Sequence, residues 1–450
     1  MIRDIADRDV MGRYVTAVRR EIATGAVDDD AAEAAHTIRP QTGARPADEI
    51  LNHLPDDGAG PDEDGPFLAR DPIVSLMQTS LDERLREEAR IEPEDAERDG
   101  IFERVLDRAD DLLHPERYGP DDPRWVTQIV KATLRRLAEG YHPFNPEPAD
   151  YEIADDARVV VVGDWGTGLE RARHVARRMA EAVTEAQAAG REAHVVHLGD
   201  VYYSGVPAEY DRNVLADGWW PVTTTQSEEG VTSWSLVGNH DMYSGGWGFF
   251  DHLLADPRFA RQRDRKNGEP TSWFRLTSPS WTIAGLDTSW NPDVVDKGTR
   301  GVLEDPQATR LQQWAAEPGG GKLMLLSHHQ YVTIDDTRGI GEDLRAKVAP
   351  MADSRRVTAW LWGHEHRCIG FATGEIPHMR CIGHGGVPVP SRPPRDPLPP
   401  PAVWEVTGSY EADGQHWGRF GFAVLDFAGD RIDVTYRDDA GAETHRETIS

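Results

Sequence analysis

The chain has 450 residues, of which 28% are charged, and its formal net charge is −29. This length provides for a large catalytic domain with an additional smaller region. The strongly negative charge repels other polyanions, which argues against long nucleic acids and anionic membranes as partners.

The cysteine content and the N-terminal sequence indicate in which cellular compartment the protein resides. The only cysteines are Cys368 and Cys381, too few for a disulfide framework, and their spacing matches no CxxC zinc site. The N-terminus is charged from its third residue, and no later segment reaches the roughly 18 consecutive apolar residues of a membrane span. We therefore expect a cytoplasmic protein without a membrane-spanning segment.

Residues 1–150 are predicted to form a mainly helical, partly irregular N-terminal region. The stretch 24–66 is acidic and rich in glycine and proline, as linkers are. Apolar residues at helical spacing predict amphipathic helices near 14–22, 71–85 and 126–137. No chemistry is evident here, and the simplest interpretation is a packing or partner-binding appendage whose partner the sequence does not identify.

Residues 151–450 show the pattern of an α/β domain, in which short apolar runs alternate with helices. The run 159–162 ends in the sequence GDWGTG and precedes a helix over 169–183. A second helix is expected around 306–318. The proline-rich stretch 387–403 should run extended on the surface. Further strands are predicted at 194–198, 233–237, 273–276, 282–286, 323–326, 358–362, 421–427 and 432–436.

Five of the strand ends carry residues that bind metals. One such motif is weak evidence, because a GD pair is usually a turn and a buried histidine is usually a hydrogen-bonded core residue. Strand ends of an open α/β sheet converge at one edge, however, so these groups can meet around a ligand. The motifs contribute Asp164; Asp200 and Tyr203; Asn239, His240 and Asp241; His328 and His329; and His364 and His366.

The donor types narrow the choice of metal. Oxygen and imidazole donors without cysteine suit iron, zinc or manganese. The number of donors is enough for two ions, which a shared carboxylate can hold about 3.5–4 Å apart, the spacing that clamps a phosphoryl group.

Residues 156–440 resemble the calcineurin-like metallophosphoesterase superfamily, and the closest branch is that of the purple acid phosphatases. Most of the superfamily begins with DxH, whereas here the third position is Gly166, and Tyr203 follows Asp200 in a GDxxY pattern. The resemblance implies a four-layer αββα sandwich of two packed mixed β-sheets flanked by helices.

The resemblance also implies roles for individual residues. Asp164, Tyr203 and His366 would hold the first metal, and Asp200 would bridge to the second. A phenolate ligand favours iron(III), so the expected pair is iron with iron, zinc or manganese, although a reducing compartment could supply iron(II) instead. The second metal would be held by Asn239, His328 and His364, with His329 as the competing choice for His328.

The expected reaction is hydrolysis of a small phosphate monoester by a metal-bound hydroxide. His240 would donate a proton or hydrogen bond, and Asp241 would orient its ring. Trp165, Glu365 and His384 are expected around the pocket. Two alternatives remain: a phosphodiesterase acting on a nucleotide or glycerophosphodiester, and an inactive interaction scaffold.

Overall fold

The computed structural model describes residues 140–291, 300–317, 319, 321–334, 340–391, 393–395, 397–412 and 415–450, together with Ala132, Arg136 and Glu139. The helices predicted near 14–22 and 71–85, and most of the helix predicted over 126–137, lie outside these residues.

The first large sheet has eight strands in the order β1-β5-β6-β7-β8-β10-β9-β11. Strands β6, β7, β8 and β10 run parallel, whereas β5, β9 and β11 introduce antiparallel pairs, so the sheet is mixed. Its strands are β1 (Ala149–Glu152), β5 (Phe274–Thr277), β6 (Trp281–Leu286), β7 (Lys322–Ser327), β8 (Val357–Trp362), β9 (Cys368–Phe371), β10 (His378–Ile382) and β11 (Ala402–Glu405).

The second large sheet has six strands in the order β16-β15-β14-β2-β3-β4. Strands β2, β3 and β4 are parallel, and β14, β15 and β16 are antiparallel. These strands are β2 (Arg158–Val162), β3 (Ala193–His197), β4 (Thr232–Ser235), β14 (Gly421–Ala428), β15 (Arg431–Asp438) and β16 (Glu443–Ile449). A separate hairpin pairs β12 (Ser409–Ala412) with β13 (Gln415–Gly418).

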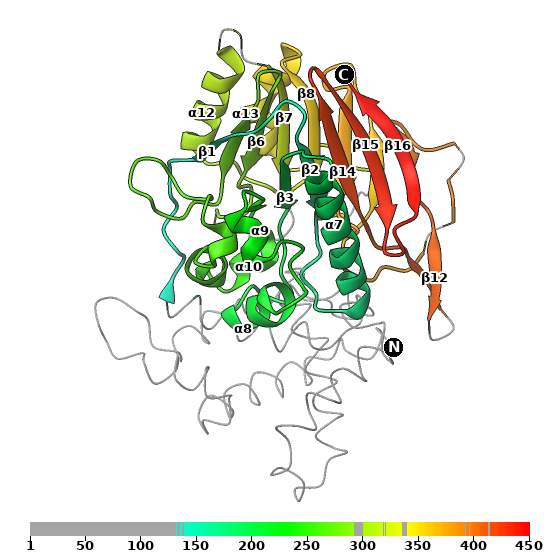
Figure 1. The fold of residues 1–450 in the computed structure, drawn as a ribbon. Helices are drawn as coiled ribbons and strands as arrows, with labels where there is room; N and C mark the ends of the chain where they lie inside the picture. Colours follow the sequence, from blue (N-terminus) through cyan, green and yellow to red (C-terminus); the bar gives the residue numbers. More distant parts are fainter. Residues whose placement is uncertain are drawn as a thin grey trace, which may run out of the picture.

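The two sheets pack against each other, and helices cover their outer faces (Figure 1). Strand β2 shows the reason: successive side chains of a strand point to opposite faces, so Val159 and Val161 enter the core between the sheets while Val160 and Val162 pack against the helical layer. The predicted four-layer αββα sandwich is therefore confirmed.

Helix α7 (Glu170–Ala188) covers the six-stranded sheet, whereas α12 (Asp305–Ala316) and α13 (Glu342–Asp353) cover the eight-stranded sheet. Between β3 and β5 lie the short helices α8 (Pro207–Tyr210), η2 (Asp211–Leu215), α9 (Thr224–Glu228), α10 (Asn239–Tyr243), η3 (Gly248–Leu253) and η4 (Pro257–Phe259). No helix among the described residues is long and apolar enough to cross a membrane.

Both helices predicted within residues 151–450 and all the predicted strands are present, and their ends differ from the predicted ones by at most five residues. The proline-rich stretch includes exposed residues such as Pro399 and leads into β11. Strand β11 lies at the edge of its sheet, where a neighbouring proline removes no hydrogen bond of the ladder.

Candidate metal centre

The loops that follow β2, β3 and β8 hold non-glycine residues in an unusual backbone conformation. The φ angles are 55° at Asp164, 75° at Asp200, 66° at His364 and 50° at His366. Among the described residues only one other non-glycine residue, Arg355, has a positive φ. Such conformations cost about 1–3 kcal/mol each and cluster at functional sites, where the surrounding structure enforces them. The surrounding structure therefore holds these four predicted ligands in conformations that they would not adopt by themselves.

Close backbone approach explains two glycines of these motifs. A Cβ atom at Gly238 would lie 2.0 Å from the Asp200 Oδ1 atom, and one at Gly363 would lie 2.6 Å from the Asp164 Oδ2 atom. Only glycine leaves room for the carboxylates at these positions.

A first group of donors comprises Asp164, Asp200 and His366, whose ligand atoms lie within 4.8 Å of one another. The hydroxyl of Tyr202 lies between them, 3.0 Å from Asp164 Oδ1, 3.0 Å from Asp200 Oδ2 and 3.2 Å from His366 Nε2. Burial, reinforced by the two carboxylates, raises the pKa of Tyr202 well above its ordinary value. A bound cation would instead lower the pKa of Tyr202.

The tyrosine whose hydroxyl lies in this group is Tyr202, whereas the predicted ligand is Tyr203. The backbone N–H of Tyr202 donates to the Gly166 carbonyl at 2.9 Å, and Gly166 also forms a bridge with Val201. These contacts align Val201 and Tyr202 with the loop that carries Asp164. Tyr203 instead uses its main chain: its N–H donates to Glu209, and its carbonyl lies 2.7 Å from His240 Nδ1.

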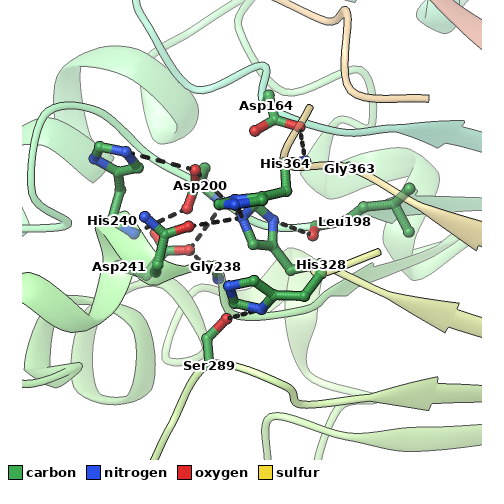
Figure 2. Close-up of polar contacts among 12 residues, drawn as sticks. Asp164, Leu198, Asp200, Gly238, His240, Asp241, Ser289, His328, Gly363 and His364 are labelled. Carbon is green, nitrogen blue, oxygen red and sulfur yellow. Dashed lines mark hydrogen bonds and ion pairs between the residues drawn. The ribbon is translucent and has the colours of Figure 1, made fainter. Parts of the chain in front are cut away.

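A second group is centred on His328, as Figure 2 shows. Its Nε2 atom lies 3.0 Å from Asn239 Oδ1, 3.2 Å from His364 Nδ1 and 3.4 Å from Asp200 Oδ2. Its Nδ1 atom faces the Leu198 carbonyl at 3.0 Å, which fixes the proton of the neutral ring on that nitrogen.

The donor arrangement of the second group fits a cation. With the proton on Nδ1, the Nε2 lone pair of His328 faces the oxygens of Asn239 and Asp200. An electron-rich atom surrounded by acceptors requires either a proton or a metal ion. Burial opposes protonation of His328, but the Asp200 carboxylate outweighs it and raises the pKa to about 9. A metal ion could take the place of that proton.

His329, the competing choice for this position, is fully buried beside the same group. Its Nδ1 lies 3.0 Å from Thr288 Oγ1 and 3.4 Å from Ser289 Oγ. His328, His329 and His364 each offer a ligand atom, and these three atoms lie within 4.8 Å of one another. Both adjacent histidines thus reach the site, but only His328 contacts Asp200.

Helix α10 places Asn239 and His240 at the end of β4. Asn239 donates from Nδ2 to the Tyr243 hydroxyl at 3.0 Å, which leaves its Oδ1 directed at His328. The Nε2 atom of His240 lies 3.9 Å from Asp200 Oδ2. His240 therefore lies at the edge of the donor set rather than within it.

Asp241 was expected to orient His240, and the structure shows four hydrogen bonds of its carboxylate to other groups. The carboxylate of Asp241 accepts hydrogen bonds from the backbone N–H groups of Asp200, Val201 and Gly238 at 2.9, 3.0 and 2.7 Å. It also accepts one from the Tyr210 hydroxyl at 2.6 Å. Asp241 thus fastens the loop that carries Asp200.

The residues expected around the pocket have different positions. Trp165 is 1% exposed and donates from Nε1 to the Ala172 carbonyl at 2.7 Å, so it belongs to the core and cannot serve as a platform for substrate. Glu365 accepts a hydrogen bond from Trp362 Nε1 at 3.0 Å. Glu365 and His384 both line a pocket whose walls also include His366. Burial lowers the pKa of His384 to about 4, although Asp164 opposes the shift.

Sequence reasoning missed two residues of this region, Tyr202 and Tyr210. A signal for Tyr202 was present, because Tyr202 and Tyr203 are adjacent in the sequence. The GDxxY pattern, however, selects the third residue after Asp200, which is Tyr203. No local pattern marks Tyr210, which meets Asp241 only through folding.

The two-sheet fold and the clustered carboxylates and imidazoles define a metal-dependent phosphoesterase. The family model described as calcineurin-like phosphoesterase matches residues 157–368, so this part of the chain is a calcineurin-like phosphoesterase domain, as predicted. That family uses two metal ions.

Two curated relatives are tartrate-resistant acid phosphatases type 5. The protein from Oryctolagus cuniculus is 25% identical over 301 residues, which cover 63% of this chain and 88% of that protein. The protein from Sus scrofa is 26% identical over 227 residues, covering 46% of this chain and 64% of the relative. The similarity to the purple acid phosphatases is thus distant.

Two solved structures are also similar. A dimetal phosphatase from Danio rerio has a TM-score of 0.44 and 13% identity, covering 66% of this chain and 99% of its own. GAP50, described as the anchor in the inner membrane complex of Plasmodium, has a TM-score of 0.45 and 12% identity, covering 65% of this chain and 88% of its own.

Proposed function

We propose that the chain hydrolyses phosphate monoesters at a two-metal centre of the purple acid phosphatase type. The observation that carries the proposal is the position of the Tyr202 hydroxyl among Asp164, Asp200 and His366. Gly166 has no side chain to offer as a ligand, and a phenol oxygen occupies the adjacent space instead.

Two ligand sets follow from the distances. Asp164, Tyr202 and His366 would hold the first ion, and Asn239, His328 and His364 the second. Asp200 would serve both, because its Oδ2 atom lies 3.0 Å from the Tyr202 hydroxyl and 3.4 Å from His328 Nε2. When bound, the ions would acidify a water molecule and neutralise charge on the phosphoryl oxygens.

The phenol ligand favours iron(III) at the first position, with iron, zinc or manganese at the second. The compartment decides which ions are available. We place the protein in the cytoplasm, and both cysteines are free and buried, which is compatible with reducing surroundings.

His240 would protonate the leaving alcohol. Its Nδ1 atom is held by the Tyr203 carbonyl at 2.7 Å, so the ring has a fixed orientation with Nε2 on the side of Asp200. In the charged form Nε2 carries the proton that a poor leaving group needs.

The test combines metal analysis with a visible spectrum of the iron-loaded wild type and of two variants, Tyr202→Phe and Tyr203→Phe. A tyrosinate-to-iron band should be present in the wild type and in Tyr203→Phe and absent from Tyr202→Phe. A band that survives in Tyr202→Phe and disappears in Tyr203→Phe would overturn the ligand assignment.

Activity on paired substrates tests the reaction itself. We expect 4-nitrophenyl phosphate to be hydrolysed faster than bis(4-nitrophenyl) phosphate. The reverse preference would indicate a phosphodiesterase, and a purified protein that retains no metal would indicate an interaction scaffold.

A further inference from the structure

A pocket opens beside the first donor group and contains two buried polar groups that the proposed reaction does not use. It encloses about 600 Å³ of empty space, including its open mouth. Water-sized spheres can be centred in about 60 Å³ of this space, so the pocket admits only a small group. His366 belongs to its lining, so the pocket adjoins one residue of the first donor group. Its walls include Arg367, His384, Val387, Glu405, Thr407 and Phe420.

Arg367 is the first of these polar groups. The residue is 7% exposed, and its guanidinium donates from Nε and Nη2 to the Glu405 carboxylate. Its Nη1 atom is also buried, and no described residue offers it an acceptor. Buried donors in native proteins are nearly always satisfied. A ligand oxygen that reached Nη1 would therefore supply the missing acceptor.

His384 is the second. It is likewise 7% exposed, and its Nδ1 atom is buried without a hydrogen-bond partner among the described residues. Its Nε2 atom packs closely on Gly421, where an added Cβ would lie only 2.7 Å away. Two buried nitrogens of the pocket lining thus lack a hydrogen-bond partner among the described residues.

The charges of the pocket exclude a strongly anionic occupant. The charge of Arg367 is balanced by Glu405, and Arg419, at the rim, is paired with Asp438 at 2.6 Å. Glu365 adds a further carboxylate to the lining. Val387, Phe420 and neighbouring apolar residues can contact a carbon skeleton. The lining therefore fits a neutral molecule that combines carbon and hydroxyl groups.

We propose that this pocket binds the alcohol part of the phosphate ester and selects polyols or sugars, whose hydroxyl groups would satisfy Arg367 Nη1 and His384 Nδ1. This inference rests on the proposed function, because the phosphate itself must be held at the adjacent metal centre. A hydroxyl would accept from Arg367 while donating to or accepting from the neutral imidazole.

The test compares two phosphonates that differ only in their hydroxyl groups, 3,4-dihydroxybutylphosphonate and butylphosphonate. Binding to the full-length, metal-loaded protein is measured by titration calorimetry. The dihydroxy compound should bind about tenfold more tightly, the factor that one hydrogen bond to a charged donor supplies. Equal affinities would overturn the inference, as would tighter binding of a bisphosphonate of the same length.

Variants test which residues cause the preference for the dihydroxy compound. Arg367→Met combined with Glu405→Gln should abolish the preference for the dihydroxy compound. The matched control is Arg380→Met with Glu447→Gln, which removes an equally buried ion pair outside the pocket and should keep the preference. His384→Leu provides an independent test if the double variant does not fold, and it should reduce the preference. Retention of the full preference in both pocket variants would contradict the assignment.

Hydrolysis of 4-nitrophenyl phosphate by the wild type separates the two proposals. If the wild type hydrolyses this ester but binds both phosphonates equally, the pocket assignment fails and the proposed function stands. If it neither hydrolyses the ester nor binds either phosphonate, the proposed function fails and the pocket assignment fails with it.

Discussion

The carboxylate of Asp241 accepts a hydrogen bond from the backbone N–H of Asp200 at 2.9 Å. The same side chain accepts hydrogen bonds from Val201 and Gly238, so one buried carboxylate organises the loops around Asp200, the proposed shared metal ligand. Burial and the charge of Asp200 raise the pKa of Asp241 to about 7, although hydrogen bonds from its partners oppose this shift.

This relationship predicts that Asp241→Ala will weaken metal binding. The substitution removes four hydrogen bonds around Asp200, and loss of such supporting contacts lowers metal affinity about 10- to 100-fold. Affinity is measured by competition with a chelator. Tyr210→Phe, which removes only one of the four bonds, should have a smaller effect. Wild-type affinity in Asp241→Ala would refute this positioning role.

Gly238→Ala should damage the centre by direct collision. The new Cβ would lie 2.0 Å from Asp200 Oδ1, and relief of such overpacking costs about 1–3 kcal/mol. We expect at least a tenfold loss of metal affinity, together with a lower thermal midpoint. Gly374→Ala is the control, because nothing lies within 4 Å of its added Cβ. Similar behaviour of the two variants would contradict the prediction.

His240→Asn should affect substrates according to their leaving groups. Asparagine can still reach the Tyr203 carbonyl but places no proton donor where Nε2 stands. For an alkyl phosphate the rate should fall about 10²- to 10⁴-fold, the usual contribution of general acid catalysis. For 4-nitrophenyl phosphate, whose leaving group needs no proton, the loss should be much smaller. An equal loss for both substrates would exclude the acid role, provided that metal content is unchanged.

The raised pKa of Asp287 predicts that the free energy of unfolding depends on pH. Burial raises its pKa to about 6, although hydrogen bonds from Ser272 and from the backbone N–H groups of Ser289 and Trp290 oppose the shift. Below the unfolded pKa of about 4 the group is protonated in both states. As the pH rises from about 4 to 6, the unfolded chain loses its proton first, so this group lowers the stability of the fold.

The total loss is roughly 3 kcal/mol at 1.36 kcal/mol per pKa unit, and it is complete above about pH 6. Asp287→Asn stays neutral and should lack this decline. Urea unfolding of both proteins at pH 4, 5, 6 and 7 measures the difference. Parallel curves for wild type and variant would show that Asp287 does not have this pKa.

Much of the fold was predictable because its signals are local. The four valines of β2 are buried on both faces, and the regular spacing of Val175, Met179 and Val183 defines the buried face of α7. Seven observed strands were not predicted, namely β1, β9, β10, β11, β12, β13 and β16. All of these except β16 have four or five residues, and such short segments gain their stability from pairing with neighbours rather than from their own pattern.

The sequence by itself determined the class of site, because carboxylates and histidines at successive strand ends indicate a metal centre. In the structure these strand ends meet from two sheets: Asp164 and Asp200 follow strands of the six-stranded sheet, whereas His328 follows a strand of the eight-stranded sheet. Only the tertiary structure decided which neighbour of Asp200 faces the centre and what Asp241 supports. Adjacent residues of a loop point their side chains in different directions, and no regular repeat in the sequence tells which one faces the site. Contacts between segments far apart in the chain set these directions. Tyr202 reaches the donor group because its main chain is hydrogen-bonded to Gly166, 36 positions earlier.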